Sequence, residues 1–321
     1  MGANVIYFEK VSPAAIQFIN EFKDPKDEVV YWSELSEEQK TKCLERAQYL
    51  ITAAYPINRE LIKKAPNARL IQKTGSGVDN IDLIAAKEMN VMVSSTPGAN
   101  SNSVAEMTIG MILCLYRKLH FMDRETKQGK WFMFEYRPSM FEMRGKTHGI
   151  IGMGNIGKAV AKLSKAFGTK IVYYDAYQMP VEQEKELEAC YLPLQDLLAA
   201  ADIVSVHIPL LPETRNLIGE KQLKMMKPNA VLINVARGHI IDEQALAAAL
   251  KNGELLGAAM DTFAGEPVSQ DNPLFKLDNV LATPHIAGGT CDVLRTVLRL
   301  SFENIAKVKT GRMPENLVNR D

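Results

Sequence analysis

The 321-residue sequence has no excess charge of either sign, because Lys plus Arg and Asp plus Glu each number 38. It therefore lacks the basic stripe that favours binding to nucleic acid or to an anionic membrane. The longest apolar run, residues 107–116, is far too short to span a bilayer. We expect no nucleic-acid or membrane partner, which leaves small neutral or anionic metabolites.

Cysteine and histidine are scarce, with four and five residues respectively. The cysteines lie far apart, without a C-x-x-C pair or a histidine at zinc-ligand spacing, so we predict no metal site. The first residues also lack the basic-then-apolar layout of a secretory signal. We expect reduced thiols in a cytoplasmic protein. The cysteines are Cys43, Cys114, Cys190 and Cys291.

Short β-branched runs are abundant and alternate with helical patterns along the whole chain. This alternation predicts parallel sheets built from βαβ units, and the chain length predicts two domains. We expect strands at residues 4–8, 28–32, 49–54, 69–73, 91–94, 149–151, 170–174, 203–208, 230–235, 255–260 and 279–282.

Several helix starts are also visible in the sequence. Ser12 precedes a proline as a helix cap, and Ser36 with Gln39 fits a capping box. A single long helix is predicted over roughly residues 101–127, and a final helix over about residues 290–308.

A glycine-rich loop directly follows the expected strand at residues 149–151. Gly152, Gly154 and Gly157 form a G-x-G-x-x-G pattern that opens a helix, as in a dinucleotide-binding fingerprint. The first glycine permits a tight turn, the second lets backbone N–H groups approach a pyrophosphate, and the third lets the helix lie close to the strand. Asp175 ends the next strand, where a carboxylate can bind the ribose hydroxyls and repel a 2′-phosphate. The predicted cofactor is therefore NAD rather than NADP.

Seven short blocks with a specific order lie along nearly the whole chain. By these blocks the sequence resembles the D-2-hydroxyacid dehydrogenase family, NAD-dependent enzymes that include phosphoglycerate, glyoxylate and hydroxypyruvate members. The blocks are GSGVDNID from Gly75, TPGANSNSVAE from Thr96, GMGNIG from Gly152, ADIVSVHIPLLPET from Ala201, INVARG from Ile233, DTFAGEP from Asp261 and TPHIAG from Thr283.

The resemblance implies an α/β fold of two doubly wound parallel-sheet domains. A flavodoxin-like substrate domain would comprise residues 1–98 plus 290–321, and a Rossmann NAD-binding domain would comprise residues 99–289. The active site would be the cleft of the two domains. The family also implies a homodimer, and the aromatic segment at residues 131–145 is typical of a packing or dimer arm.

Carried over by position, the resemblance makes His285 the acid and base, Glu266 its carboxylate partner and Arg237 the substrate anchor. The chemistry agrees with these roles. A histidine titrates near neutrality, a carboxylate orients it, and the planar fork of an arginine grips a carboxylate in two places. Reduction of a 2-oxo acid needs such a proton donor and cation beside the hydride donor. Each residue, taken alone, is more typical of a structural role.

The remaining predicted site residues surround the cofactor and the substrate. In the first domain, the loop with Ser76 and Gly77 would bring backbone N–H groups to the substrate carboxylate. Lys73 stands where phosphoglycerate-type members often have arginine, so recognition of a phosphate stays open. The substrate set is Lys73, Ser76, Gly77 and Asn102. The cofactor set is Gly152, Gly154, Asn155, Ile156, Gly157, Asp175, His207, Pro209, Thr214, Val235, Ala236, Asp261 and Gly288.

Two alternatives remain open from the sequence. The first is a dinucleotide-sensing binding protein that resembles the corepressors of this superfamily and acts through a partner contact. The second is oxidation of formate or phosphite on the same scaffold. The identity of the 2-hydroxy acid and the physiological direction of the reaction are also open.

Overall fold

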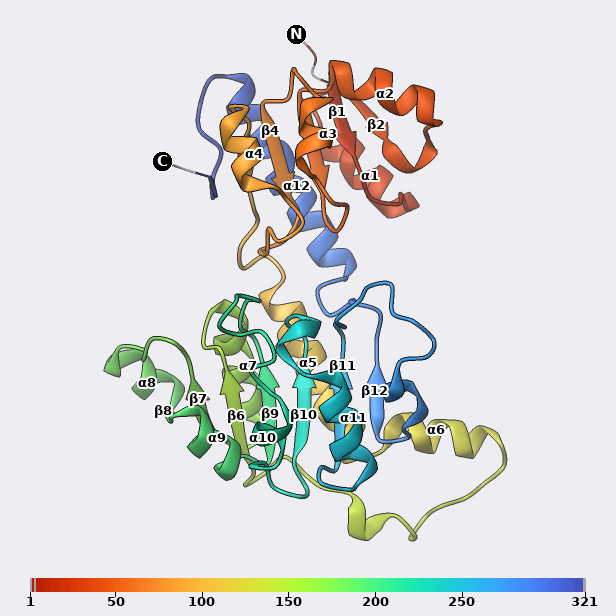
Figure 1. Cartoon of the computed structure of the whole chain (residues 1–321), viewed down its shortest axis with the longest axis vertical. Coiled ribbons are helices and arrows are strands. Elements are labelled where there is room, and N and C mark those ends of the chain that lie inside the picture. Colours follow the sequence, from red (N-terminus) through yellow and green to blue (C-terminus); the bar gives the residue numbers. More distant parts are fainter. Residues whose placement is uncertain (1, 3, 320–321) are drawn as a thin grey trace. The chain divides into compact units, whose positions relative to one another are not determined.

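The computed structural model describes residue 2 and residues 4–319, whereas residues 1, 3, 320 and 321 lie outside the description. The chain forms two compact units, unit 1 with residues 1–100 and 290–321 and unit 2 with residues 101–289. Each unit contains one parallel sheet with helices on both faces (Figure 1). The predicted fold class is therefore confirmed. Among the described residues, no helix has the length and apolar character needed to cross a membrane.

Unit 1 has a five-stranded sheet in the order β2-β1-β3-β4-β5, which is the flavodoxin-like order. Four of the five strands are largely buried, as expected for a sheet covered on both faces. The strands are β1 (Asn4–Tyr7), β2 (Glu28–Tyr31), β3 (Tyr49–Thr52), β4 (Leu70–Lys73) and β5 (Met92–Ser94).

Helices from both ends of the chain complete unit 1. The predicted caps are confirmed: Ser12 accepts a hydrogen bond from the Ala15 N–H, and Ser36 with Gln39 forms the capping box. One hydrophobic core lies between one face of the sheet and the helices α1 (Pro13–Phe22) and α12 (Cys291–Lys309). A second hydrophobic core lies between the other face of the sheet and the helices α2 (Glu37–Arg46), α3 (Arg59–Lys63) and α4 (Leu83–Glu88).

Unit 2 has a seven-stranded sheet in the order β12-β11-β10-β9-β6-β7-β8. From β6 the strands β7 and β8 are added on one side, whereas β9 to β12 are added on the other, so the strand order switches between the parallel neighbours β6 and β9. Open α/β sheets bind ligands at such a switch point. The strands are β6 (Thr147–Ile151), β7 (Lys170–Tyr174), β8 (Ala189–Tyr191), β9 (Ile203–Val206), β10 (Val231–Asn234), β11 (Gly257–Met260) and β12 (Val280–Ala282).

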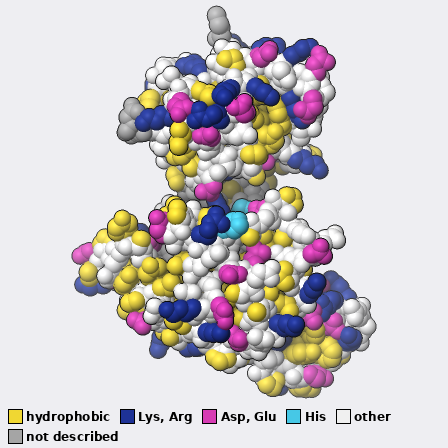
Figure 2. Space-filling model, viewed as in Figure 1, with side chains coloured by type: hydrophobic (Ala, Val, Ile, Leu, Met, Phe, Trp, Pro, Cys, Tyr) yellow, Lys and Arg dark blue, Asp and Glu magenta, His cyan; other side chains and the backbone are white. Residues whose placement is uncertain are grey.

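The helices of unit 2 divide between the two faces of its sheet (Figure 1). One face packs against α5 (Ser101–Tyr116), α7 (Asn155–Ala166) and α8 (Val181–Leu187). The other packs against α9 (Leu194–Ala200), α10 (Glu220–Leu223) and α11 (Glu243–Lys251). Charges of both signs are interspersed over the face of each unit in Figure 2, as the zero net charge leads one to expect.

One sequence-based expectation about the elements of unit 2 is wrong, and one strand was missed. The predicted helix over residues 101–127 is two helices, α5 and α6 (Leu119–Lys127), because Lys118 has a left-handed backbone with φ of 51°. A run of helical residues gives no local sign of such a break. The strand β8 was not predicted, because its residues Ala189–Tyr191 include no β-branched residue, the feature that marked most of the other strands.

Candidate active site

The predicted site residues of unit 2 gather at the carboxyl ends of its strands. The glycine loop follows β6, Arg237 follows β10, Glu266 follows β11, and His285 follows β12. The last three strands are direct neighbours in the sheet, so these loops lie side by side. Parallel strands therefore bring together residues that are far apart in the sequence.

The glycine loop has the geometry that its three glycines were predicted to provide. Gly152 has φ of 99°, a left-handed value that a side chain rarely adopts. A Cβ on Gly157 would lie 2.0 Å from the Gly152 carbonyl oxygen, whereas a Cβ on Gly154 would meet nothing within 4 Å. The turn and the helix contact need glycine, and the space beside Gly154 at the start of α7 suits a pyrophosphate.

Asp175 holds this loop from the end of β7. One carboxylate oxygen, Oδ2, accepts a hydrogen bond of 2.7 Å from the Met153 N–H within the glycine loop. The other, Oδ1, accepts one of the same length from the Ala176 N–H. Because each carboxylate oxygen can accept two hydrogen bonds, the side chain keeps acceptor capacity for ribose hydroxyls. The residues of the loop thus fit a dinucleotide.

Arg237 is positioned by a buried asparagine that the site prediction did not include. Asn234 ends β10 and has no exposed surface. Its Oδ1 accepts from the Ala236 N–H at 3.1 Å, and its Nδ2 donates to the Arg237 carbonyl at 2.9 Å. The guanidinium itself donates to the Ala236 carbonyl at 2.7 Å. A polar residue at the end of the otherwise apolar run VLIN was the available signal for this role.

The next residue, Gly238, brings the loops after β10 and β11 into direct contact. A Cβ at this position would lie 1.8 Å from the Phe263 carbonyl carbon and 2.2 Å from the Ala264 nitrogen. Only glycine allows the two backbones to approach so closely. The positions of Arg237 and of the Glu266 loop are therefore coupled through the main chain.

His285 and Glu266 form a hydrogen-bonded pair. His285 Nδ1 lies 2.8 Å from Glu266 Oε2, and Glu266 Oε1 accepts from the Phe263 N–H at 3.0 Å. Since an ionised carboxylate only accepts hydrogen bonds, Nδ1 is the donor and Nε2 is the atom that can give or take a proton. The side chains of His285 and Glu266 are 47% and 39% exposed, so the pair lies at the protein surface and not in the core.

A buried carboxylate shapes the turn that carries His285. Asp261 has no exposed surface, and its oxygens accept from the Thr283 hydroxyl at 2.6 Å, the Ile286 N–H at 2.9 Å and the Ala287 N–H at 2.8 Å. Its carbonyl also accepts from the His285 N–H at 2.8 Å. These bonds position the turn, while the predicted contact of Asp261 with the cofactor stays a prediction.

The middle of the chain matches a known family. Residues 109–287 match the model described as D-isomer specific 2-hydroxyacid dehydrogenase, NAD binding domain. The chain belongs to the D-isomer specific 2-hydroxyacid dehydrogenase family. The predicted reaction class and cofactor are confirmed: this is an NAD-dependent dehydrogenase that interconverts a D-2-hydroxy acid and its 2-oxo acid.

Similar proteins cover most of the chain. A glyoxylate reductase of Aeropyrum pernix is 37% identical over 99% of this chain and 96% of its own length. A D-3-phosphoglycerate dehydrogenase of Methanocaldococcus jannaschii is 39% identical over 89% of this chain, which spans only 54% of that protein. The NAD-complexed D-isomer specific 2-hydroxyacid dehydrogenase from Lactobacillus delbrueckii has a TM-score of 0.80 at 29% identity, covering 98% of this chain and 99% of its own.

His207 of the dehydrogenase ends a buried hydrogen-bonded chain of side chains. Its Nε2 and the Nε2 of His148 both lie 2.8 Å from the Ser205 hydroxyl. His148 Nδ1 lies 2.8 Å from the Ser164 hydroxyl, which continues to Thr169. Burial lowers the pKa of each histidine to about 3, so both are neutral at neutral pH. His207 Nδ1 is buried without a hydrogen-bond partner among the described atoms.

Most other predicted cofactor residues of the dehydrogenase lie in loops at the same edge of the sheet. Thr214 closes the loop after β9, where its hydroxyl donates to the Pro209 carbonyl at 2.8 Å. Val235 and Ala236 are buried beyond β10, and Gly288 follows the His285 turn. Asn155 and Ile156 are the first residues of α7. These positions are compatible with cofactor binding, and their roles stay predictions.

The predicted substrate residues have a different arrangement. In unit 1, Lys73 is the last residue of β4 and donates to the Ala53 carbonyl and, at 2.7 Å, to the Asn80 side chain. Ser76 and Gly77 lie in the loop between β4 and α4. Asn102 belongs to unit 2 and is exposed in the first turn of α5.

Proposed function

We propose that the enzyme reduces glyoxylate or a similarly small, unphosphorylated 2-oxo acid with NADH. The observation that carries this proposal is the 2.8 Å hydrogen bond of Glu266 to His285 Nδ1. It leaves Nε2 to give a proton to the developing alkoxide. The similarity to the glyoxylate reductase of Aeropyrum pernix supports the choice of a small acid.

In this proposal Arg237 binds the substrate carboxylate and polarises the carbonyl group. NADH, when bound, supplies the hydride. Glu266 orients the imidazole and stabilises its protonated form before the proton is transferred. An unphosphorylated substrate is favoured because the Lys73 ammonium already donates to Ala53 and Asn80, which leaves at most one of its three N–H donors for a phosphate.

NADH oxidation with a panel of 2-oxo acids tests the proposal. Glyoxylate and hydroxypyruvate should give higher kcat/KM values than phosphohydroxypyruvate and than bulkier branched or aromatic acids. A preference for phosphohydroxypyruvate would contradict the substrate assignment alone. Binding of NADH without turnover of any acid would contradict the enzymatic role and favour the cofactor-sensing alternative.

We also propose that the protein is a cytoplasmic homodimer that binds no nucleic acid. The arm at residues 131–145 exposes Trp131, Met133 and Phe134 with 76%, 60% and 59% of their surfaces accessible. Large adjacent apolar side chains of this kind favour a subunit contact. All four cysteines are free, which suits a reducing compartment.

A further inference from the structure

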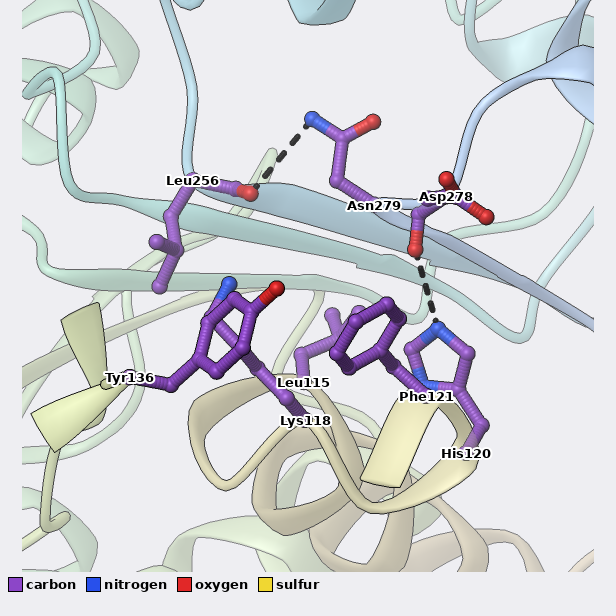
Figure 3. A pocket seen from close by; sticks show the side chains of 8 residues that line it. All are labelled: Leu115, Lys118, His120, Phe121, Tyr136, Leu256, Asp278 and Asn279. Carbon is purple, nitrogen blue, oxygen red and sulfur yellow. Dashed lines mark hydrogen bonds between the residues drawn. The ribbon is translucent and has the colours of Figure 1, made fainter. Parts of the chain in front are cut away.

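The connection from β11 to β12 carries Glu266, the proposed partner of the catalytic histidine. Because β11 and β12 are parallel neighbours, this connection leaves the carboxyl edge of the sheet and returns to the amino edge. Figure 3 shows how its far end is fixed: His120 Nε2 lies 3.0 Å from the Asp278 carbonyl oxygen, and the Asn279 side chain donates to the Leu256 carbonyl at 3.5 Å. The part still to be fixed is the stretch around Glu266.

A short helix anchors the middle of this connection. η4 (Pro273–Lys276) buries Leu274 completely. The side chain of Asn272 caps this helix by accepting from the Leu274 N–H at 3.0 Å. Residues 264–271, among them Glu266, lie between β11 and this anchored helix and belong to no helix or strand. A stretch of this kind keeps one conformation only if other elements bind it.

Glu243 binds both ends of this stretch. Its Oε1 accepts from the Ala264 N–H at 2.5 Å, and its Oε2 accepts from the Asn272 side-chain amide at 2.7 Å. Hydrogen bonds to an ionised carboxylate are about twice as strong as those between neutral groups. One carboxylate therefore closes the loop that presents Glu266.

The helix that carries Glu243 is a rigid support for this loop. Glu243 is the first residue of α11, whose side chains Leu246 and Leu250 are buried in the core of unit 2. Asp242 already supplies the cap of this helix. The Glu243 carboxylate is therefore not needed as a cap and can bond to the loop, while the helix N-terminus favours its negative charge.

We propose that Glu243 is a positioning residue for the acid-base pair, an inference that rests on the catalytic roles proposed above. The Phe263 N–H donates to Glu266 Oε1 at 3.0 Å, and Glu266 Oε2 lies 2.8 Å from His285 Nδ1. Glu243 holds the next residue after Phe263, which is Ala264. Without Glu243, the Glu266 carboxylate should spend less time at Nδ1, and the imidazole should lose its fixed orientation.

Steady-state kinetics of the intact protein test this role, with the 2-oxo acid that gives the highest kcat/KM in the panel above. Glu243→Ala should lower kcat by about tenfold to a hundredfold, because small displacements of a catalytic group have effects of this size. The dissociation constant for NADH should stay the same. Glu243→Gln should lose less activity, since its single side-chain oxygen can still accept from the Ala264 N–H.

Glu220→Ala is the matched control. Glu220 is also the first residue of a helix in unit 2, but its carboxylate pairs with Lys224 at 2.6 Å. This variant should keep the kcat of the unchanged enzyme. An equal loss of kcat in Glu220→Ala and Glu243→Ala would overturn the proposal.

A double variant separates positioning from a general loss of stability. If Glu243 acts through Glu266, adding Glu243→Ala to Glu266→Ala should lower kcat no further. A further loss as large as that in the single variant would overturn the positioning role, as would an unchanged kcat in Glu243→Ala.

Hydrogen exchange, followed by peptide mass spectrometry without NADH, tests the loop independently of turnover. The amides of residues 263–272 should exchange faster in Glu243→Ala than in the unchanged protein, because the Ala264 N–H loses its acceptor. Unchanged exchange would overturn the proposal even if the enzyme is active. Turnover of no 2-oxo acid would contradict the proposed function instead, and the exchange measurement would still decide whether Glu243 holds the loop.

Discussion

His285 has φ of 53°, a left-handed conformation that a residue other than glycine adopts only where its surroundings compensate for the cost. Here the compensation comes from Asp261, whose carbonyl and carboxylate hold the turn through residue 287. The turn directs Nδ1 to Glu266. The strained backbone therefore serves to orient one imidazole.

His285→Gln tests the proposed acid-base role. Glutamine can still accept or donate a hydrogen bond but cannot carry the proton, so kcat should fall by about a hundredfold to ten-thousandfold. The dissociation constant for NADH, measured by fluorescence titration, should change little. Near-normal turnover in the variant would show that His285 is not the acid-base catalyst and has only a structural role.

Asp175→Asn tests cofactor selection without removing the bond to the glycine loop, because the amide oxygen can still accept from the Met153 N–H. The unchanged enzyme should prefer NADH over NADPH by about a hundredfold in kcat/KM, since a carboxylate repels a 2′-phosphate. The variant should narrow this preference by about tenfold. Equal rates with both cofactors in the unchanged enzyme would refute the argument from charge.

Gly238→Ala tests the contact of the two catalytic loops. The added Cβ would lie 1.8 Å from the Phe263 carbonyl carbon, so the loops must separate. We expect a loss of about 1–3 kcal/mol in the free energy of unfolding and a lower kcat. Gly265→Ala is the matched control, because a Cβ there meets nothing within 4 Å. Equal effects of the two substitutions on urea unfolding would rule out the close-contact explanation.

At the scale of elements, polar residues connect strands and helices inside both cores. In unit 1, Asn304 of α12 donates to Gln72 at 2.9 Å and to Ser94 at 3.1 Å, which ties the C-terminal helix to β4 and β5. In unit 2, the His148 chain connects β6, β9 and α7. Buried polar groups that are hydrogen-bonded in this way specify how the elements pack.

The His148 chain predicts a specific pH dependence of stability. Because burial lowers the pKa of His148 to about 3, the unfolded chain binds more protons than the folded chain below the ordinary histidine pKa. The free energy of unfolding should therefore fall as the pH drops below about 6.5, by up to roughly 1.4 kcal/mol per pH unit for this histidine. His207 adds a similar dependence.

His148→Gln provides the comparison, because glutamine can hydrogen-bond to Ser164 or Ser205 but does not titrate. Urea unfolding between about pH 7 and about pH 5 should show a shallower pH dependence in this variant than in the unchanged protein. Parallel curves would show that His148 does not contribute in this range.

For the whole molecule, the exposed arm predicts an assembly. Trp131→Glu combined with Phe134→Glu places charges on the apolar surface proposed as the subunit contact. The molar mass from light scattering should fall to roughly half that of the unchanged protein. If the variant keeps the mass of a dimer, the subunit contact lies on another surface. If the protein without these substitutions is already a monomer, the homodimer proposal is wrong.

Apart from β8, the strand positions, the parallel sheets and the glycine loop were predictable, because each depends on local patterns of apolar and turn residues. The break at Lys118 was not, because nothing in the residues around it differs from a continuous helix. The positioning role of Asn234 was also missed, and the hydrogen-bond partners of His148 were not predicted. The partners of His148 lie in distant segments of the chain, so they follow only from the tertiary structure, whereas the Asn234 side chain bonds to residues within three positions.

The sequence by itself determined the α/β class, the NAD fingerprint and the identity of the residues proposed for catalysis, since these follow from short motifs in a specific order. Only the tertiary structure decided which atoms meet. It places His285 Nδ1 within hydrogen-bonding distance of Glu266 and Cys114 beside His120. It also shows that the Lys73 ammonium donates a hydrogen bond within unit 1, to Asn80. The physical reason is that parallel strands assemble loops from distant segments, and hydrogen bonds between such segments leave no trace in local composition.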